Sequence, residues 1–232
     1  MVTRAAFPAQ AMAPTCSGPG VAALAVYLLG RQHLPVERTA GCLEEAFGAA
    51  VSTGWLCSLL PNAAARLDGF LAIAREQLAA ARVAHFDETG GRVAGGLHQI
   101  HVACNDTWTL LHPGSKRGRV AMDAAGVLPG LRGIAIHDGL VLYRQYDKAQ
   151  HGLCNAHHLR ELAGLAELTG QAWPNQLAEL LVELHVAVEI AKAGGSAKFP
   201  ARRLATFGKR YDVLIAQGNK LNPPPPRTGK RG

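Results

Sequence analysis

The stretch "ARVAHFDETGGRV", residues 81 to 93, raises the first question about this chain. The run Val83-Ala84-His85-Phe86 is mostly apolar, and two carboxylates, Asp87 and Glu88, follow it directly. Alternating and aromatic residues of this kind favour a strand, and the Gly90-Gly91 pair favours a turn. The pattern therefore predicts a strand that enters a core and ends in two acidic side chains.

A second strand of the same kind is predicted further along the chain. "RGIAIHDG", residues 132 to 139, is apolar until it reaches Asp138. Between the two aspartates, the sequence predicts strands at 96–106 and 107–114 and a helix at 117–128. Three strands, a helix and a further strand predict a mixed α/β sheet.

The two aspartates suggest a metal site. If their strands are neighbours in one sheet, Asp87 and Asp138 lie side by side, and paired carboxylates favour a bound cation. Oxygen ligands suit Mg²⁺ or Mn²⁺ better than zinc, and two such ions about 4 Å apart catalyse phosphoryl transfer. The alternative is that both aspartates only cap turns before glycine, and the sequence leaves this open.

The other regions of the chain are predicted to be mainly helical. Residues 1–20 form an Ala-, Pro- and Gly-rich leader, and 21–82 a helical segment in which two helices resemble a helix-turn-helix. The second of these, at 52–60, has no Arg or Lys for phosphates, so we favour a bundle with Trp55 and Leu56 in its core. We expect the sheet at 83–150, a helical insertion at 151–218 and a Pro-rich basic tail at 219–232.

The positive charge is concentrated near the C-terminus. The net charge is +7, and the segment from Lys192 to Gly232 contains ten Lys and Arg and one Asp. Such a segment attracts a polyanion such as nucleic acid, although a solvated helix face and tail explain the charge equally well. The five cysteines include no Cys-x-x-Cys pair, and no apolar run approaches the roughly 18 residues of a membrane span. We therefore expect a cytoplasmic protein that does not bind a membrane.

Two further groups of residues are candidates for binding. Lys116, Arg117 and Arg119 lie in a Gly-flanked turn before a helix, which is typical of a phosphate site or of a solvated loop. The spacing of Cys154 and His157 is compatible with zinc, with a DNA contact or with a role inside a helix N-terminus.

Several motifs together resemble the transposases of the insertion-sequence 66 family. They are "LAVYLLGRQHLPVERTAGCLEEAFG", "HFDETGGRVAGGLHQIHVA", "LLHPGSKRGRVAMDAAGVLPGLRGIAIHDG" and "HGLCNAHHLREL". The resemblance extends over most of residues 18 to 225. It implies a ribonuclease-H-like core with a helical insertion, in which two divalent ions, Mg²⁺ or Mn²⁺, and an Asp-Asp-Glu triad cut and join DNA.

The resemblance also implies roles for individual residues and partners. Asp87 and Asp138 match the first two acids of the triad, and Cys154 and His157 match a Cys-x-x-His pair of the family. The implied partners are the double-stranded DNA of transposon ends and target, and a second copy of the chain or a full-length transposase, in a nucleoid-associated location. The expected DNA contacts are Lys116, Arg117, Arg119, Arg160, Arg202 and Arg203.

The sequence departs from the family pattern at both ends. The family's third acid lies in an Asn-Asn-x-x-Glu-Arg segment that this sequence lacks, and the N-terminal zinc-binding and coiled-coil part is also missing. We therefore expect a truncated copy with weak or absent strand transfer. The alternatives are a catalytically inactive DNA-binding remnant and a metal-dependent nuclease in which Glu161 completes the site.

Overall fold

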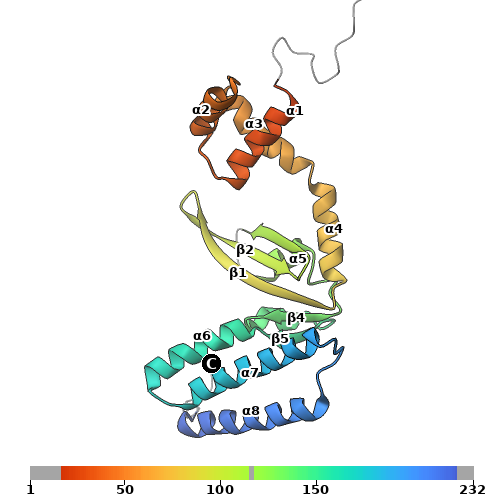
Figure 1. The fold of residues 1–232 in the computed structure, drawn as a ribbon, viewed down its shortest axis with the longest axis vertical. Coiled ribbons are helices and arrows are strands. Elements are labelled where there is room, and N and C mark those ends of the chain that lie inside the picture. The colour runs from red at the N-terminus through yellow and green to blue at the C-terminus, as the bar shows by residue number, and fades with distance from the viewer. Residues whose placement is uncertain (1–16, 115–117, 224–232) are drawn as a thin grey trace, which may run out of the picture. The chain divides into compact units, whose positions relative to one another are not determined.

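The computed structural model of the chain describes residues 17–114 and 118–223 (Figure 1). The chain divides into two compact units, Met1–Glu76 and Gln77–Gly232, which are described separately below. Within the described ranges, no single helix is both long and apolar enough to cross a membrane; only the helix pair Thr53–Ala65 and Asp68–Ala79, bent by 42°, passes that test of length and composition when taken together.

The first unit is a small helical bundle. Its elements are α1 (Pro19–Val26), a π-helical turn η2 (Tyr27–Arg31), α2 (Val36–Phe47), α3 (Thr53–Ala65) and most of α4 (Asp68–Ala79). The core contains Ala25, Leu29, Leu43 and Leu56, and Trp55 packs against it. The helix with Trp55 and Leu56 is thus a packed member of the bundle.

Within this unit, the residue pattern predicts that Ser52 caps a helix and that a further helix spans 62–83. Ser52 is the N-cap of α3, as expected, and its hydroxyl accepts a hydrogen bond from the Trp55 amide at 3.2 Å. The helix expected at 62–83 is wrong at its start, because α3 continues through Pro61 to Ala65. Its last turn is then tightened by hydrogen bonds from Arg66 to Ala63 and from Leu67 to Ala64, which end the helix before α4 begins.

The second unit contains a five-stranded mixed sheet within the described residues. Its strands are β1 (Val83–Val93), β2 (Gly96–Cys104), β3 (Thr109–Gly114), β4 (Ile134–His137) and β5 (Gln150–Leu153). They are arranged in the order β3-β2-β1-β4-β5. The pairs β3–β2 and β2–β1 are antiparallel, and the pairs β1–β4 and β4–β5 are parallel. The predicted mixed α/β sheet is confirmed.

The strand β1 is longer than the sequence predicted. It runs through Gly90 and Gly91, which pair with Gln99 and His98, so the turn expected at this glycine pair is wrong. The hairpin instead turns at Ala94 and Gly95, whose φ angles are +49° and +81°. A type I′ turn in a two-residue hairpin requires positive φ at both central residues, a requirement that Gly95 meets without strain. Asp87 and Glu88 therefore lie inside a strand, and the strand does not end at them.

One face of the sheet is covered by short helical elements. The helix α5 (Arg119–Ala125) follows β3, and a 3₁₀ helix, η3 (Val141–Gln145), connects β4 to β5. Side chains from these elements meet the sheet around a small cavity of about 20 Å³, whose lining includes Phe86, Ala103, Leu110, Met122 and Tyr143. Phe86 of this packed face directly precedes Asp87 and Glu88 in β1.

Three helices complete the second unit. They are α6 (Asn155–Thr169), α7 (Trp173–Ala193) and α8 (Ala201–Leu221). They agree closely with the helices that the apolar periodicity of the sequence predicts at 155–168, 174–193 and 199–217. Their shared core is formed by Leu162, Trp173, Leu177, Leu180, Ala187 and Phe207. Three of the expected segment boundaries, those after residues 20, 150 and 218, fall inside elements of the structure. The helix α1 begins at Pro19, β5 begins at Gln150 and α8 extends to Leu221.

Candidate metal centre

Parallel pairing of β1 with β4 sets the two aspartates at equivalent positions. Val83 pairs with Ile134, Ala84 with Ala135, and His85 with Ile136. Continued by two residues, the same register sets Asp87 opposite Asp138. The pairing with β4 stops at this point while β1 continues as one arm of the β1–β2 hairpin. The two carboxylates therefore lie where two neighbouring parallel strands separate.

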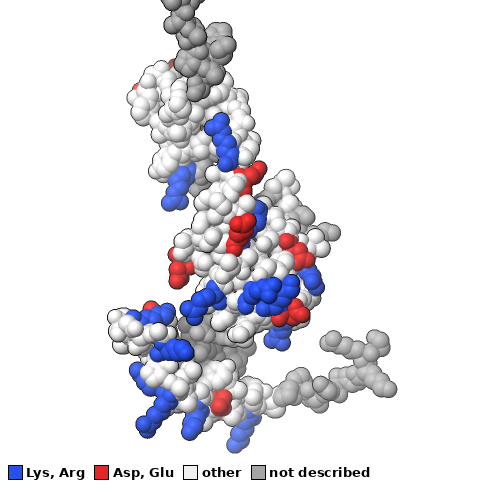
Figure 2. All heavy atoms as spheres, turned by 90° about the vertical axis from the view of Figure 1, so that its right-hand side faces the viewer, with Lys and Arg blue, Asp and Glu red and all other residues white. Residues whose placement is uncertain are grey.

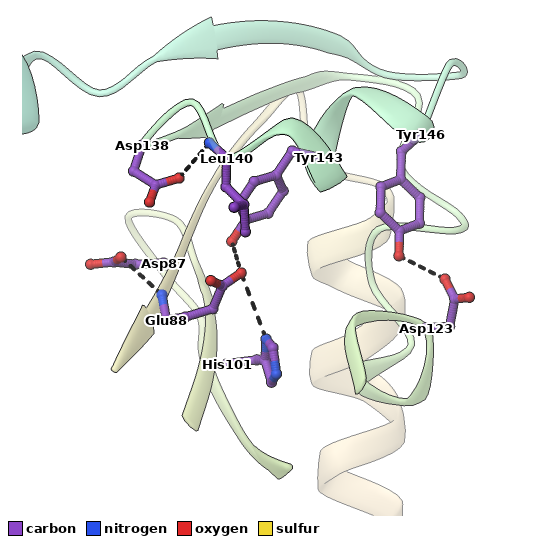
Figure 3. A network of polar contacts seen from close by, with 8 residues as sticks. All are labelled: Asp87, Glu88, His101, Asp123, Asp138, Leu140, Tyr143 and Tyr146. Atoms are coloured by element: carbon purple, nitrogen blue, oxygen red, sulfur yellow. Dashed lines mark hydrogen bonds and ion pairs between the residues drawn. The ribbon is translucent and has the colours of Figure 1, made fainter. Parts of the chain in front are cut away.

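The alternation of a strand gives the adjacent acids Asp87 and Glu88 opposite surroundings. Ala84 and Phe86 are buried, whereas Asp87 is exposed. Glu88 lies on the same face as Phe86, and its side chain is only 1% exposed. Figure 3 shows Asp87 turned away from Glu88, on the side of the view where Asp138 also lies.

Each aspartate is oriented by a backbone amide. The Glu88 amide donates to Oδ1 of Asp87 at 2.9 Å, and the Leu140 amide donates to Oδ1 of Asp138, also at 2.9 Å (Figure 3). Hydrogen bonds to a carboxylate are stronger than those between neutral groups. The second bond is the turn-capping bond that the alternative interpretation of Asp138 predicted, so Asp138 caps its turn and lies opposite Asp87 at the same time.

A buried polar contact connects β1 to the segment after Asp138. The hydroxyl of Tyr143, in η3, donates to Oε1 of Glu88 at 2.9 Å, and Nδ1 of His101 lies 3.9 Å from the same oxygen. Burial and the neighbouring Glu88 carboxylate raise the pKa of Tyr143 well above its ordinary value. The tyrosine therefore keeps its proton and remains a hydrogen-bond donor to Glu88.

A pair of histidines supports the turn that carries Asp138. Nδ1 of His137 accepts a hydrogen bond from the Gly139 amide at 3.0 Å, so the proton of the neutral ring is on Nε2, which lies 3.1 Å from Nδ1 of His151. Nε2 of His151 in turn lies 3.2 Å from the Tyr146 carbonyl oxygen. Burial and the nearby His151 lower the pKa of His137, which favours this neutral arrangement.

The expected DNA-binding residues have varied surroundings. Arg160 on α6 and Arg202 and Arg203 on α8 are exposed, and the Arg203 guanidinium lies 5.2 Å from the centre of the Phe199 ring. Arg119 is engaged locally, at 3.5 Å from Asp123 and 3.2 Å from the Gln145 side chain. Lys116 and Arg117 lie outside the described residues.

Cys154 and His157 lie at the start of α6. Cys154 is the N-cap residue, and its amide donates to the His137 carbonyl at 2.8 Å. Nδ1 of His157 is buried without a hydrogen-bond partner. Glu161, considered above as a third acid, is largely exposed, and its carboxylate lies 3.8 Å from Nδ1 of His158 on the same helix.

The donor set at the point where β1 and β4 separate suits a hard cation. Mg²⁺ is commonly bound through one or two carboxylates, with waters and substrate phosphates completing its coordination. Asp87 and Asp138 supply two such carboxylates. Across the described part of the chain, no group of three or more His, Cys, Asp or Glu is arranged to hold a metal ion.

The sequence alone assigned Glu88, Tyr143, His137 and His151 no role at this site; His151 was considered only with Cys154 and His157, as a possible zinc ligand. One signal was available for Glu88, because it follows Ala84 and Phe86 at the spacing of two residues that marks one face of a strand. The other three residues contribute through contacts between separate elements, and a single sequence contains no signal for such contacts.

The comparisons with known proteins agree with the motifs. The family model described as "Transposase IS66 family" matches residues 14–221. The chain therefore belongs to the IS66 family of transposases, and its function is related to transposition. No curated protein matches the chain.

One solved structure is similar at a low level. It is a chain in the "CryoEM structure of simian T-cell lymphotropic virus intasome in complex with PP2A regulatory subunit B56 gamma". The identity is 12%, the match covers 89% of this chain and 72% of that chain, and the TM-score is 0.29. A likeness of this extent carries no argument about the site.

Proposed function

We propose that the chain is a metal-dependent DNA transposase in which Asp87 and Asp138 hold the divalent ions. Membership of the transposase family supports the reaction class. The sheet order β3-β2-β1-β4-β5, with three antiparallel strands followed by two parallel ones, is compatible with a ribonuclease-H-like core. The observation that carries the proposal is the β1–β4 register, which sets Asp87 opposite Asp138 where the strands separate.

The roles of the chain's own residues follow from this geometry. Asp87 and Asp138 bind the cation through carboxylate oxygens, and the amides of Glu88 and Leu140 fix the orientation of those carboxylates. Bound Mg²⁺ or Mn²⁺ supplies Lewis acidity for the attack of water or a hydroxyl on a phosphodiester. The exposure of Asp87 leaves room for a DNA backbone to approach.

The partner in this proposal is double-stranded DNA, the transposon end and its target. The helix α8 contains Arg202, Arg203, Lys209, Arg210 and Lys220 and a single acid, Asp212. Figure 2 shows Lys and Arg gathered at the lower end of the view, the region of α8 in Figure 1. Clustered positive charge of this kind binds phosphates with little dependence on sequence.

Calorimetric titration of the full chain with Mn²⁺ tests the metal site. We expect binding in the wild type, its loss in Asp87→Asn and in Asp138→Asn, and no change in Asp106→Asn, a control at an exposed aspartate in the β2–β3 turn. Plasmid nicking in Mg²⁺ should likewise be present in the wild type and in Asp106→Asn and be lost in Asp87→Asn and in Asp138→Asn. Equal Mn²⁺ binding in the wild type and in both site variants would contradict the assignment.

A second candidate is a DNA-binding protein of the same family that does not cut DNA. The observation in its favour is that, among the described residues, no third ligand joins the two aspartates. This candidate predicts salt-dependent DNA binding that survives both Asp→Asn changes, together with no nicking by the wild type. Nicking that is lost in both variants would exclude it in favour of the enzyme.

A further inference from the structure

The two aspartates are connected through the interior by hydrogen bonds. The Glu88 amide holds Asp87, and the Glu88 side chain accepts from the Tyr143 hydroxyl at 2.9 Å. The amide of Tyr143 donates to the Leu140 carbonyl at 3.1 Å, and the Leu140 amide holds Asp138. Glu88 and Tyr143 contribute their side chains to this path, and Figure 3 shows the hydrogen bond between them.

Packing alone does not explain a glutamate at this position. The side chain of Glu88 is 1% exposed and Tyr143 is 2% exposed, so both polar groups are removed from water. A buried carboxylate is costly even when it is hydrogen-bonded, and apolar side chains of similar volume are often as stable or more stable. Stability therefore does not explain the presence of the Glu88–Tyr143 pair, whereas its position between Asp87 and Asp138 does.

We propose that Glu88 and Tyr143 are positioning residues that fix the Asp87 and Asp138 carboxylates relative to each other for cation binding. This inference rests on the proposed function. The contact ties β1 to η3, the element that follows Asp138, at the point where the β1–β4 pairing has already ended. The Tyr143 ring also stacks on His137, with ring centres 4.4 Å apart, and His137 holds the Gly139 amide in the turn of Asp138.

The chain contains a matched control for this contact. Tyr146 is also buried, at 6% exposure, and its hydroxyl donates to the carboxylate of Asp123 at 2.7 Å. Burial and that hydrogen bond raise its pKa in the same direction as for Tyr143. Asp123 belongs to α5 and lies outside the path between the two aspartates (Figure 3). Tyr146→Phe therefore removes a similar bond without touching the proposed site.

The test is the Mn²⁺ affinity of the full chain, measured from the electron paramagnetic resonance signal of free Mn²⁺. Loss of a group that orients a metal ligand typically costs about 10- to 100-fold in affinity. We expect a loss of this size in Tyr143→Phe and wild-type affinity in Tyr146→Phe. Glu88→Gln retains an acceptor for the hydroxyl, so its loss of affinity should be smaller than that of Tyr143→Phe.

A second readout follows the turn itself in the absence of metal. Hydrogen exchange at the Gly139 and Leu140 amides should accelerate in Tyr143→Phe and remain unchanged in Tyr146→Phe. Thermal unfolding of each variant confirms that it is folded before affinity is compared.

The outcomes separate the two proposals. If wild-type Mn²⁺ binding is lost in Asp87→Asn but Tyr143→Phe retains full affinity, the site stands and the positioning role is overturned. An equal loss in Tyr143→Phe and Tyr146→Phe would also overturn it, because the effect would then be general. A wild-type chain that binds no Mn²⁺, or that binds it equally in Asp87→Asn, overturns the proposed function and the positioning role together.

Discussion

Consecutive acids at 87 and 88 perform different tasks because a strand turns successive side chains to opposite faces. Asp87 is exposed, and Glu88 is buried beside Tyr143 and His101. The sequence was sufficient to propose Asp87 as a ligand, because an acid after an apolar run is conspicuous. It was insufficient for the role of Glu88, because Tyr143 is 55 residues away and the contact depends on how η3 folds back onto β1.

The Glu88–Tyr143 contact makes a prediction about stability. Tyr143→Phe removes a buried hydrogen bond to the Glu88 carboxylate, which should lower the free energy of unfolding by about 1–3 kcal/mol in a urea titration. Adding Glu88→Gln to this variant removes the charge and should restore part of the loss. If the double variant is less stable than Tyr143→Phe by as much as Glu88→Gln alone lowers the stability of the wild type, the two residues are not directly coupled.

A cysteine near Asp87 reports on its charge. Burial, and secondarily the Asp87 carboxylate, raise the pKa of Cys104 above its ordinary value of 9.0, so less thiolate is present at a given pH. At pH 8.5 without metal, iodoacetamide should label Cys104 more slowly than the exposed Cys57. Asp87→Asn lowers the pKa of Cys104 and should accelerate its labelling, with Cys57 unchanged as the internal control. An unchanged rate at Cys104 would show that the Asp87 charge does not act there.

At the scale of elements, the approach of β4 to β1 depends on a glycine. A Cβ at Gly133 would collide with the carbonyl oxygens of Ala81 and Arg82, and the Arg82 oxygen accepts the Ile134 amide at 2.9 Å where the two strands meet. The β1–β4 register that aligns Asp87 with Asp138 therefore requires the absence of a side chain at 133.

This requirement gives a test with a control in a helix. Gly133→Ala should force the start of β4 away from β1 and lower the free energy of unfolding by about 1–3 kcal/mol, the usual cost of overpacking. Gly164→Ala in α6 meets no atom within 4 Å and should instead stabilise the chain by about 0.5–1 kcal/mol. Equal stability of Gly133→Ala and the wild type in urea would show that the close approach is unnecessary.

Elements were predictable where their residues carried a local signal. The helices α6 to α8 have long apolar periodicity, and β4 begins with the short apolar run Ile134-Ala135-Ile136, so the sequence alone indicated them. The strand β5 was missed because "QHGL" contains no β-branched or aromatic residue and pairs only because β4 lies beside it. The hairpin turn was expected at Gly90-Gly91 because glycine pairs favour turns, whereas strand pairing with β2 extends the strand through them.

At the scale of the whole molecule, the positive charge is concentrated in one segment. The chain has a net charge of +7, and α8 alone contains five basic residues and one acid. The charge distribution could be read from the sequence directly. The apolar stripe of α8 also indicates that its charged face is exposed, but a single sequence does not show that α7 is the element packed against that stripe.

DNA binding by α8 makes a prediction about salt dependence. Each phosphate contact contributes about 0.9 to the slope of log K against log salt concentration for B-DNA. Removing Arg202 and Arg203 together should therefore reduce that slope by up to about 2, measured by fluorescence anisotropy with a DNA duplex. Arg38→Ala, at an exposed arginine of α2, serves as the control. If Arg38→Ala changes the slope by as much as the removal of Arg202 and Arg203 does, the effect comes from net charge alone.

The measurement that tests the central claim most directly is anomalous scattering from a crystal of the full chain soaked in Mn²⁺. The account predicts a manganese peak in contact with the carboxylates of Asp87 and Asp138, at the point where β1 and β4 separate. The same peak should be missing from crystals of Asp87→Asn. Manganese that binds elsewhere in the chain, with neither aspartate as a ligand, would contradict the account.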